Sequence, residues 1–163
     1  MDRLMIHHRA WEALGRADEA YGATRDAVLR DEPVGRLREA FASGSGDRLA
    51  LRFLGYIAPT RPDIVQELIP ELFDYCLGMD PYATRARYLL AGLRPDQRDS
   101  RLEPLVSARV ADPDPESDTE LRALAMTLEQ IGRLDWLERL KDAVRDSPSE
   151  DLRGIAEDFP EFS

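Results

Sequence analysis

Acidic residues recur at helical spacing in three segments of this sequence. Asp63, Glu67, Glu71 and Asp74 follow one another at intervals of 4, 4 and 3 residues, which on a helix places their carboxylates on one face. Two later segments have a similar pattern and add Asp99, Glu103, Asp135, Glu138 and Asp142. Paired carboxylates perform acid–base chemistry when their surroundings push their pKa values apart, and stripes this regular do not favour that. They favour the binding of a cationic partner.

The same residues have a structural interpretation. Every amphipathic helix exposes a polar face, and runs of charge usually occupy such a solvated face. Arg139 and Arg145 are also close enough in sequence to neutralise part of the third stripe. The sequence leaves both interpretations open.

Histidine and cysteine are too sparse to build a reactive or metal site. His7 and His8 are the only histidines, whereas a zinc site needs three or four convergent ligands. His8 is expected to pack beside Trp11 on a helix. Cys76 is the only cysteine, so no intramolecular disulfide can form, and its apolar neighbours favour a buried, structural thiol. We expect no catalytic residue, no metal and no cofactor.

Helices are the elements that must position these side chains. Apolar residues at helical spacing predict two helices over residues 2–14 and 18–30, with Gly15 ending the first, and a third over residues 33–42. Residues 43–46 form a Ser/Gly turn or hinge. Outer helices are predicted near residues 47–58, 80–93 and 117–131, and inner helices over 62–77, 96–111 and 134–146. A short helix starts near Ser149.

Prolines modify the inner helices. Pro70 removes one backbone donor inside the first inner helix and is predicted to kink or split it near Leu68 and Ile69. Pro104 falls at a similar place in the second. Tyr82 and Tyr88, on the central outer helix, are expected to pack in the core or at its rim.

The outer helices repeat with a period of 35 residues. Leu51, Ala86 and Leu121 are 35 residues apart. The same step links three further sets, Leu54/Leu89/Leu124, Ala58/Leu93/Leu128 and Arg52/Arg87/Arg122. Periods of about 20 to 50 residues indicate stacked supersecondary units, each too small to bury its apolar face alone.

In this region the chain resembles bacterial HEAT-like repeat proteins. In that family a turn with Asp-Pro leads into an outer helix with an Arg about five residues on and a Leu-rich stripe. Asp80, Pro81, Arg85, Leu89 and Leu93 match in order, and two further segments match in part. The partial matches are Asp118, Leu121, Arg122, Ala123 and Leu128 in one segment, and Asp47, Arg48, Leu51 and Leu54 in the other. The N-terminal Trp11, Leu14, Gly15 and Ala27 look like part of a tetratricopeptide pattern that lacks its next aromatic residue.

Both resemblances imply an all-α fold, a right-handed α-solenoid or superhelix of antiparallel helix pairs. We expect one domain over residues 1–163. It would comprise an irregular helical cap (1–43), about three helix pairs (47–147), and a C-terminal cap and tail (148–163) in which Phe159 and Phe162 cover the last pair. The resemblance to HEAT-like arrays implies that the inner helices, and so the acidic stripes, line a concave surface.

Charge and composition limit the partner. The formal net charge is −10, from 32 acidic and 22 basic residues, which disfavours nucleic acid and an anionic membrane surface. With no signal-peptide pattern or long apolar run, we expect a cytoplasmic protein. The sequence favours a non-enzymatic module that binds a basic protein, such as an immunity-type inhibitor of a cationic toxin. The alternatives are a lyase-like enzyme or enzyme accessory on a HEAT-like scaffold, and a general scaffold hub.

Overall fold

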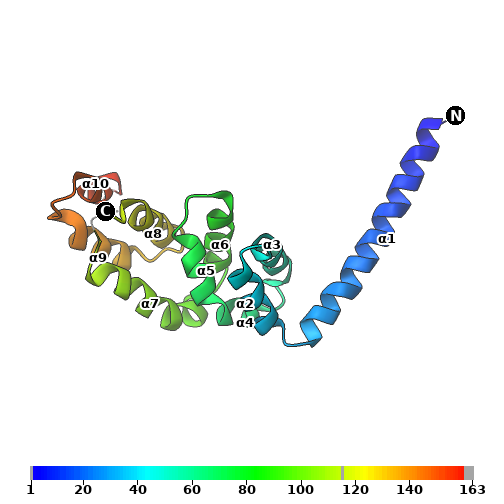
Figure 1. Ribbon diagram of the computed structural model, residues 1–163, viewed down its shortest axis with the longest axis horizontal. Coiled ribbons are helices and arrows are strands. Elements are labelled where there is room, and N and C mark those ends of the chain that lie inside the picture. The colour runs from blue at the N-terminus through cyan, green and yellow to red at the C-terminus, as the bar shows by residue number, and fades with distance from the viewer. Residues whose placement is uncertain (1, 115, 160–163) are drawn as a thin grey trace. The chain divides into compact units, whose positions relative to one another are not determined.

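The computed structural model describes the backbone of residues 2–114 and 116–159, and the side chains from residue 8 onward in these ranges. Every regular element in this part of the chain is a helix, which confirms the all-α class (Figure 1). The helices are α1 (Asp2–Arg30), α2 (Pro33–Ser43), α3 (Asp47–Ile57), α4 (Pro62–Glu67), α5 (Ile69–Cys76), α6 (Pro81–Ala91), α7 (Pro95–Ala111), α8 (Asp118–Gln130), α9 (Leu134–Arg145) and α10 (Glu150–Asp158). None of these described helices combines the length and the apolar run needed to cross a bilayer.

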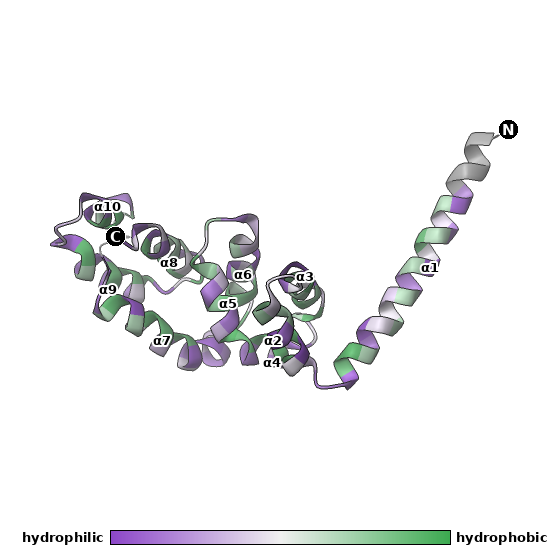
Figure 2. Cartoon of the chain, in the orientation of Figure 1, coloured by the Kyte–Doolittle hydropathy of each residue, from purple (hydrophilic) through white to green (hydrophobic). Residues whose placement is uncertain are grey.

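The chain divides into two compact units, Met1–Leu37 and Arg38–Ser163. In the first unit, α1 is one continuous helix, so the predicted break at Gly15 is wrong. An isolated glycine costs a helix only about 1 kcal/mol, and six alanines between residues 2 and 30 favour continuity. The predicted packing of His8 is also wrong, because its side chain is 76% exposed and contacts Glu12. Figure 2 shows apolar and polar residues alternating along this helix.

The second unit contains the apolar core that concerns the site. Helix α6 packs against α3, α5 and α8, while α7 packs against α5 and α9. The 35-residue register matches burial at Leu51, Ala86 and Leu121, which are all buried. It does not match burial in the arginine set, where Arg87 is buried and Arg52 is exposed. Helix α10 closes the end of this unit against α8 and α9. Phe159 is buried there as expected, whereas Phe162 lies outside the described residues.

Local backbone chemistry sets the helix boundaries. The Asp80 carboxylate accepts hydrogen bonds from the amides of Tyr82 and Ala83 at 2.7 and 2.9 Å, an N-cap for α6. Gly132 adopts φ +73° just after α8, a left-handed conformation that suits glycine. The split predicted at Pro70 is confirmed, because Leu68 separates α4 from α5. Pro104 instead lies inside the continuous helix α7.

Candidate functional site

An arginine two residues before an aspartate marks the starts of α4, α7 and α9. In each of the three cases the guanidinium donates to the carboxylate, and this hydrogen bond holds the pKa of the aspartate below its usual value. The pairs are Arg61–Asp63, Arg94–Asp96 and Arg133–Asp135, with N–O distances of 2.7, 3.0 and 2.6 Å. The pattern Arg-x-Asp is visible in the sequence and could have revealed these local pairs.

Other ion pairs connect α4 to α7 and α7 to α9. Arg101 of α7 reaches Glu67 of α4 at 2.5 Å. Arg139 of α9 lies 3.6 Å from Glu103 of α7. Because such pairs lie on neighbouring elements, they tie consecutive helices together. The carboxylates at these positions therefore contribute to the packing of the array.

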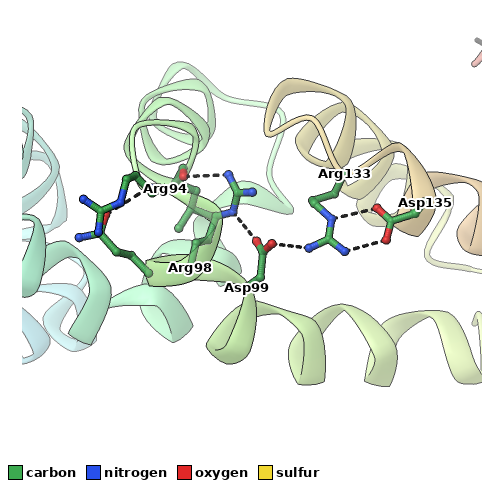
Figure 3. A network of polar contacts seen from close by, with 7 residues as sticks. Arg94, Arg98, Asp99, Arg133 and Asp135 are labelled. Carbon is green, nitrogen blue, oxygen red and sulfur yellow. Dashed lines mark hydrogen bonds and ion pairs between the residues drawn. The ribbon is translucent and has the colours of Figure 1, made fainter.

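The most connected of these links centres on Asp99 (Figure 3). Its carboxylate accepts hydrogen bonds from Arg98 at 2.9 Å and from Arg133. Arg98 is only 2% exposed and also donates to the Leu90 carbonyl at the end of α6. The Arg133 guanidinium in turn stacks on the Trp136 ring, 3.7 Å from its centroid. This network joins the start of α9 and the end of α6 to α7.

Eight of the nine carboxylates predicted to bind a partner thus contact a cation of the same chain. They are Asp63, Glu67, Glu71, Asp99, Glu103, Asp135, Glu138 and Asp142. The ninth, Asp74, is exposed and has no such contact among the described residues. The predicted binding residues do lie on helices, α4, α5, α7 and α9, but most of their charge is balanced by cations among the described residues.

A second feature lies between α3 and α6, which run side by side in the same direction. At their beginnings, the Arg48 guanidinium lies 5.0 Å from the centroid of the Tyr82 ring. Just past their ends, Ala58 and Leu93 line a common pocket. We define the α3–α6 groove by two adjoining pockets of about 470 and 530 Å³ that share Pro81 and Arg85. The smaller is lined by Arg48, Leu49, Arg52, Pro81, Tyr82 and Arg85.

The larger pocket completes the groove with a mostly apolar lining. It is lined by Gly55, Ala58, Pro59, Pro81, Thr84, Arg85, Tyr88, Leu89, Gly92 and Leu93. Leu49 and Tyr88 border the groove with 67% and 68% of their surface exposed. The expectation that Tyr88 packs in the core or at its rim is therefore wrong.

In the second unit, the groove collects the exposed arginine side chains that form no ion pair or hydrogen bond among the described residues. The side chains of Arg48, Arg52 and Arg85 make no ion pair or hydrogen bond within the part of the chain described by the structure, and the Arg48 guanidinium lies over the Tyr82 ring. The other thirteen Lys and Arg residues between positions 38 and 159 each contact a carboxylate or a backbone carbonyl.

The acidic residues nearest to these arginines in sequence have other roles. Asp47 accepts from the Tyr75 hydroxyl at 3.0 Å and from the Arg48 amide at 2.6 Å, and Asp80 caps α6. Three guanidinium groups therefore border one groove without a counter-charge assigned to them. Sequence analysis missed this site because it joins two helices, with Arg52 and Arg85 lying 33 residues apart in the chain.

Two buried groups have structural roles. Burial raises the pKa of the Cys76 thiol to about 12, so the thiol stays protonated and unreactive at neutral pH, as predicted. Arg87 is 3% exposed and donates to two backbone carbonyls at the end of α5. No group of three or more potential metal ligands occurs among the described residues.

Comparison of the chain with protein-family models, with curated proteins and with solved structures finds no match. The functional interpretation therefore depends on the charge, exposure and shape of the surfaces described above. Of these surfaces, the α3–α6 groove combines a concave shape with guanidinium groups that form no ion pair or hydrogen bond among the described residues.

Proposed function

We propose that residues 38–163 form a non-enzymatic protein-binding module that holds a segment of its partner in the α3–α6 groove. The observation that carries the proposal is that exposed apolar side chains lie beside arginines whose side chains form no ion pair or hydrogen bond in the part of the chain that the structure describes. Tyr88 and Leu49 are more than half exposed beside Arg52 and Arg85. Tyrosine and arginine are enriched where protein interfaces gain most of their binding energy.

We further propose that these helices form a right-handed, HEAT-like superhelix in which α3, α6 and α8 are the outer helices. The shared burial pattern at Leu51, Ala86 and Leu121 supports this. The position of α6 between α3 and α8, and of α7 between α5 and α9, supports it as well. In such an array the groove belongs to the outer surface, opposite the face favoured by the acidic stripes.

Photocrosslinking tests the proposed site. Tyr88 is replaced by p-benzoylphenylalanine in the full chain, and crosslinked proteins from the native host are identified after irradiation. The matched control carries the same group at Met126, an exposed apolar residue of α8. We expect a product that forms from position 88, is absent from position 126, and disappears in the R52E/R85E variant. Identical products from both positions would refute the assignment.

The inner helices support a second candidate, the binding of a basic protein. Residues 38–163 contain 25 acidic and 16 basic residues. Asp74 is exposed without an ion pair, and the second carboxylate oxygen of Glu71 has no hydrogen-bond partner among the described residues. That Glu71 oxygen is buried, so a basic partner would use the exposed Asp74 carboxylate and leave the intramolecular pairs intact. Loss of binding in D74K, with binding retained in R52E/R85E, would favour this candidate over the groove.

A further inference from the structure

We propose that the segment held by the α3–α6 groove is acidic at one end and apolar at the other, with its acidic end beside Arg48, Arg52 and Arg85. The inference depends on the proposed function, because it specifies the chemistry of the partner at that same groove. Arg85 lines both pockets of the groove. The pocket for the acidic end of the segment therefore adjoins the pocket for its apolar end.

Charge is the first argument. Three guanidinium groups around one pocket repel one another, and a partner carboxylate that enters relieves this repulsion while gaining charge-assisted hydrogen bonds. Arginine suits this role because its planar group can hold a carboxylate with two parallel bonds. The Asp47 carboxylate already accepts from Tyr75 and from a backbone amide. The remaining anionic groups must therefore come from the partner.

The rest of the surface selects among anionic partners. A nucleic acid extends its negative charge over many phosphates, and binding it requires an extended basic surface. Outside the groove, every Lys and Arg from position 38 to 159 is already bound to a carboxylate or a carbonyl. A net charge of −10 repels a long polyanion. A short acidic peptide segment fits a basic patch of this limited extent.

The apolar end gives the segment a direction. From Arg48 to Ala58 the groove follows ten residues of helical rise, which at 1.5 Å per residue is about 15 Å. An extended chain covers that length in about five residues. The partner's acidic residues should therefore lie about five positions from its apolar residues when extended, or about ten when helical. The apolar residues contact Tyr88, Leu89 and Leu93.

Selection from a random peptide library displayed on phage tests the inference. The full chain is the bait, and each enriched peptide is then measured against the R52E/R85E variant by fluorescence anisotropy. The matched control is R109E/R145E, which changes the net charge equally on exposed side chains outside the groove. The Y88A variant tests the apolar end, and its side chain is exposed enough that folding should not depend on it.

The expected peptides carry two or more acidic residues and a pair of apolar residues. The two groups are separated by about five positions if the peptide is extended, or about ten if it is helical. The affinity of these peptides should fall about 100-fold in R52E/R85E, fall about tenfold in Y88A, and change less than about threefold in the control. Peptides that depend on Tyr88 but contain no acidic residues and ignore R52E/R85E would overturn the inference and leave the groove as the binding site. If every enriched peptide ignores both variants, the proposed function fails as well. Preferential binding of a single-stranded RNA oligomer over the acidic peptides would also overturn the inference.

Discussion

Replacing Arg87 by methionine should destabilise the second unit strongly, although this arginine pairs with no carboxylate in the described structure. Its Nη2 donates to the Cys76 and Gly78 carbonyls at 2.8 and 2.6 Å, and its Nε donates to the Thr127 hydroxyl at 3.2 Å. The two carbonyls lie at the C-terminus of α5, where helical carbonyls lack partners within the helix and a cation is favourable. Arg87 therefore joins α5, α6 and α8.

The magnitude follows from the groups left behind. Methionine fills the apolar path of the side chain but leaves two carbonyls without their donor. Each orphaned carbonyl costs about 1 to 3 kcal/mol. The Thr127 hydroxyl still donates to the Ala123 carbonyl at 2.8 Å, so the loss of its hydrogen bond from Arg87 costs little. The variant no longer buries a charged guanidinium, which offsets part of the cost of the two orphaned carbonyls. We therefore expect a net loss of about 3 kcal/mol in unfolding free energy.

Urea unfolding followed by circular dichroism measures this loss. The matched control is R52M, because Arg52 lies 35 residues earlier at the equivalent position and is exposed without a partner in the described structure. We expect R87M to lower the unfolding free energy by about 3 kcal/mol and R52M to change it by less than about 0.5 kcal/mol. If R87M costs no more than R52M, water or rearranged backbone satisfies the two carbonyls and the reasoning is wrong.

Three further predictions concern titration and exposure. Burial, the largest cause in each case, raises the pKa of Tyr75 from 10.0 and that of Cys76 from 9.0, both to about 12. The stability that these two neutral groups contribute should therefore be complete below about pH 9 and be lost as the pH rises toward 12. Urea melts of a Y75F/C76A variant should lose most of this pH dependence. The Cys76 thiol should react with a disulfide reagent only at urea concentrations that unfold the chain, and rapid labelling of the native protein would contradict its burial. The hydrogen bond from Arg133 lowers the pKa of Asp135. The stability that the ionised Asp135 contributes is therefore present above about pH 4 and is lost as the pH falls through the folded-state pKa. The unfolding free energy of R133Q should depend less on pH than that of the unmodified chain in urea melts between pH 2 and 5.

Local signals in the sequence predicted much of the second unit. The N-cap at Asp80, the end of α8 at Gly132 and the split at Pro70 each follow from chemistry within a few residues. The break at Gly15 was wrong because a glycine signal of about 1 kcal/mol cannot end a helix whose other residues favour it. Local propensity also could not show that Trp11 is 74% exposed.

The candidate site depended on contacts that a single sequence does not display. The acidic stripes were correctly placed on helices, and some of their cations are local in sequence, but the cations that balance Glu67, Glu71 and Glu103 are distant in the chain. Arg101 is 34 residues from Glu67. The groove likewise depends on Arg52 and Arg85 approaching from two helices. What could be read locally is that Arg48 and Arg52, one helical turn apart, have no acidic residue one turn away on α3.

The central claim is that the groove arginines serve binding and contribute little to folding. Its most direct test measures both properties on one variant, R48Q/R52Q/R85Q, using the urea melt and a peptide selected on the unmodified chain. The account predicts an unfolding free energy equal to or above that of the unmodified chain, because mutual repulsion is removed, together with at least a 100-fold loss of peptide affinity. A variant that is destabilised by several kcal/mol, or that binds the peptide undiminished, would contradict it.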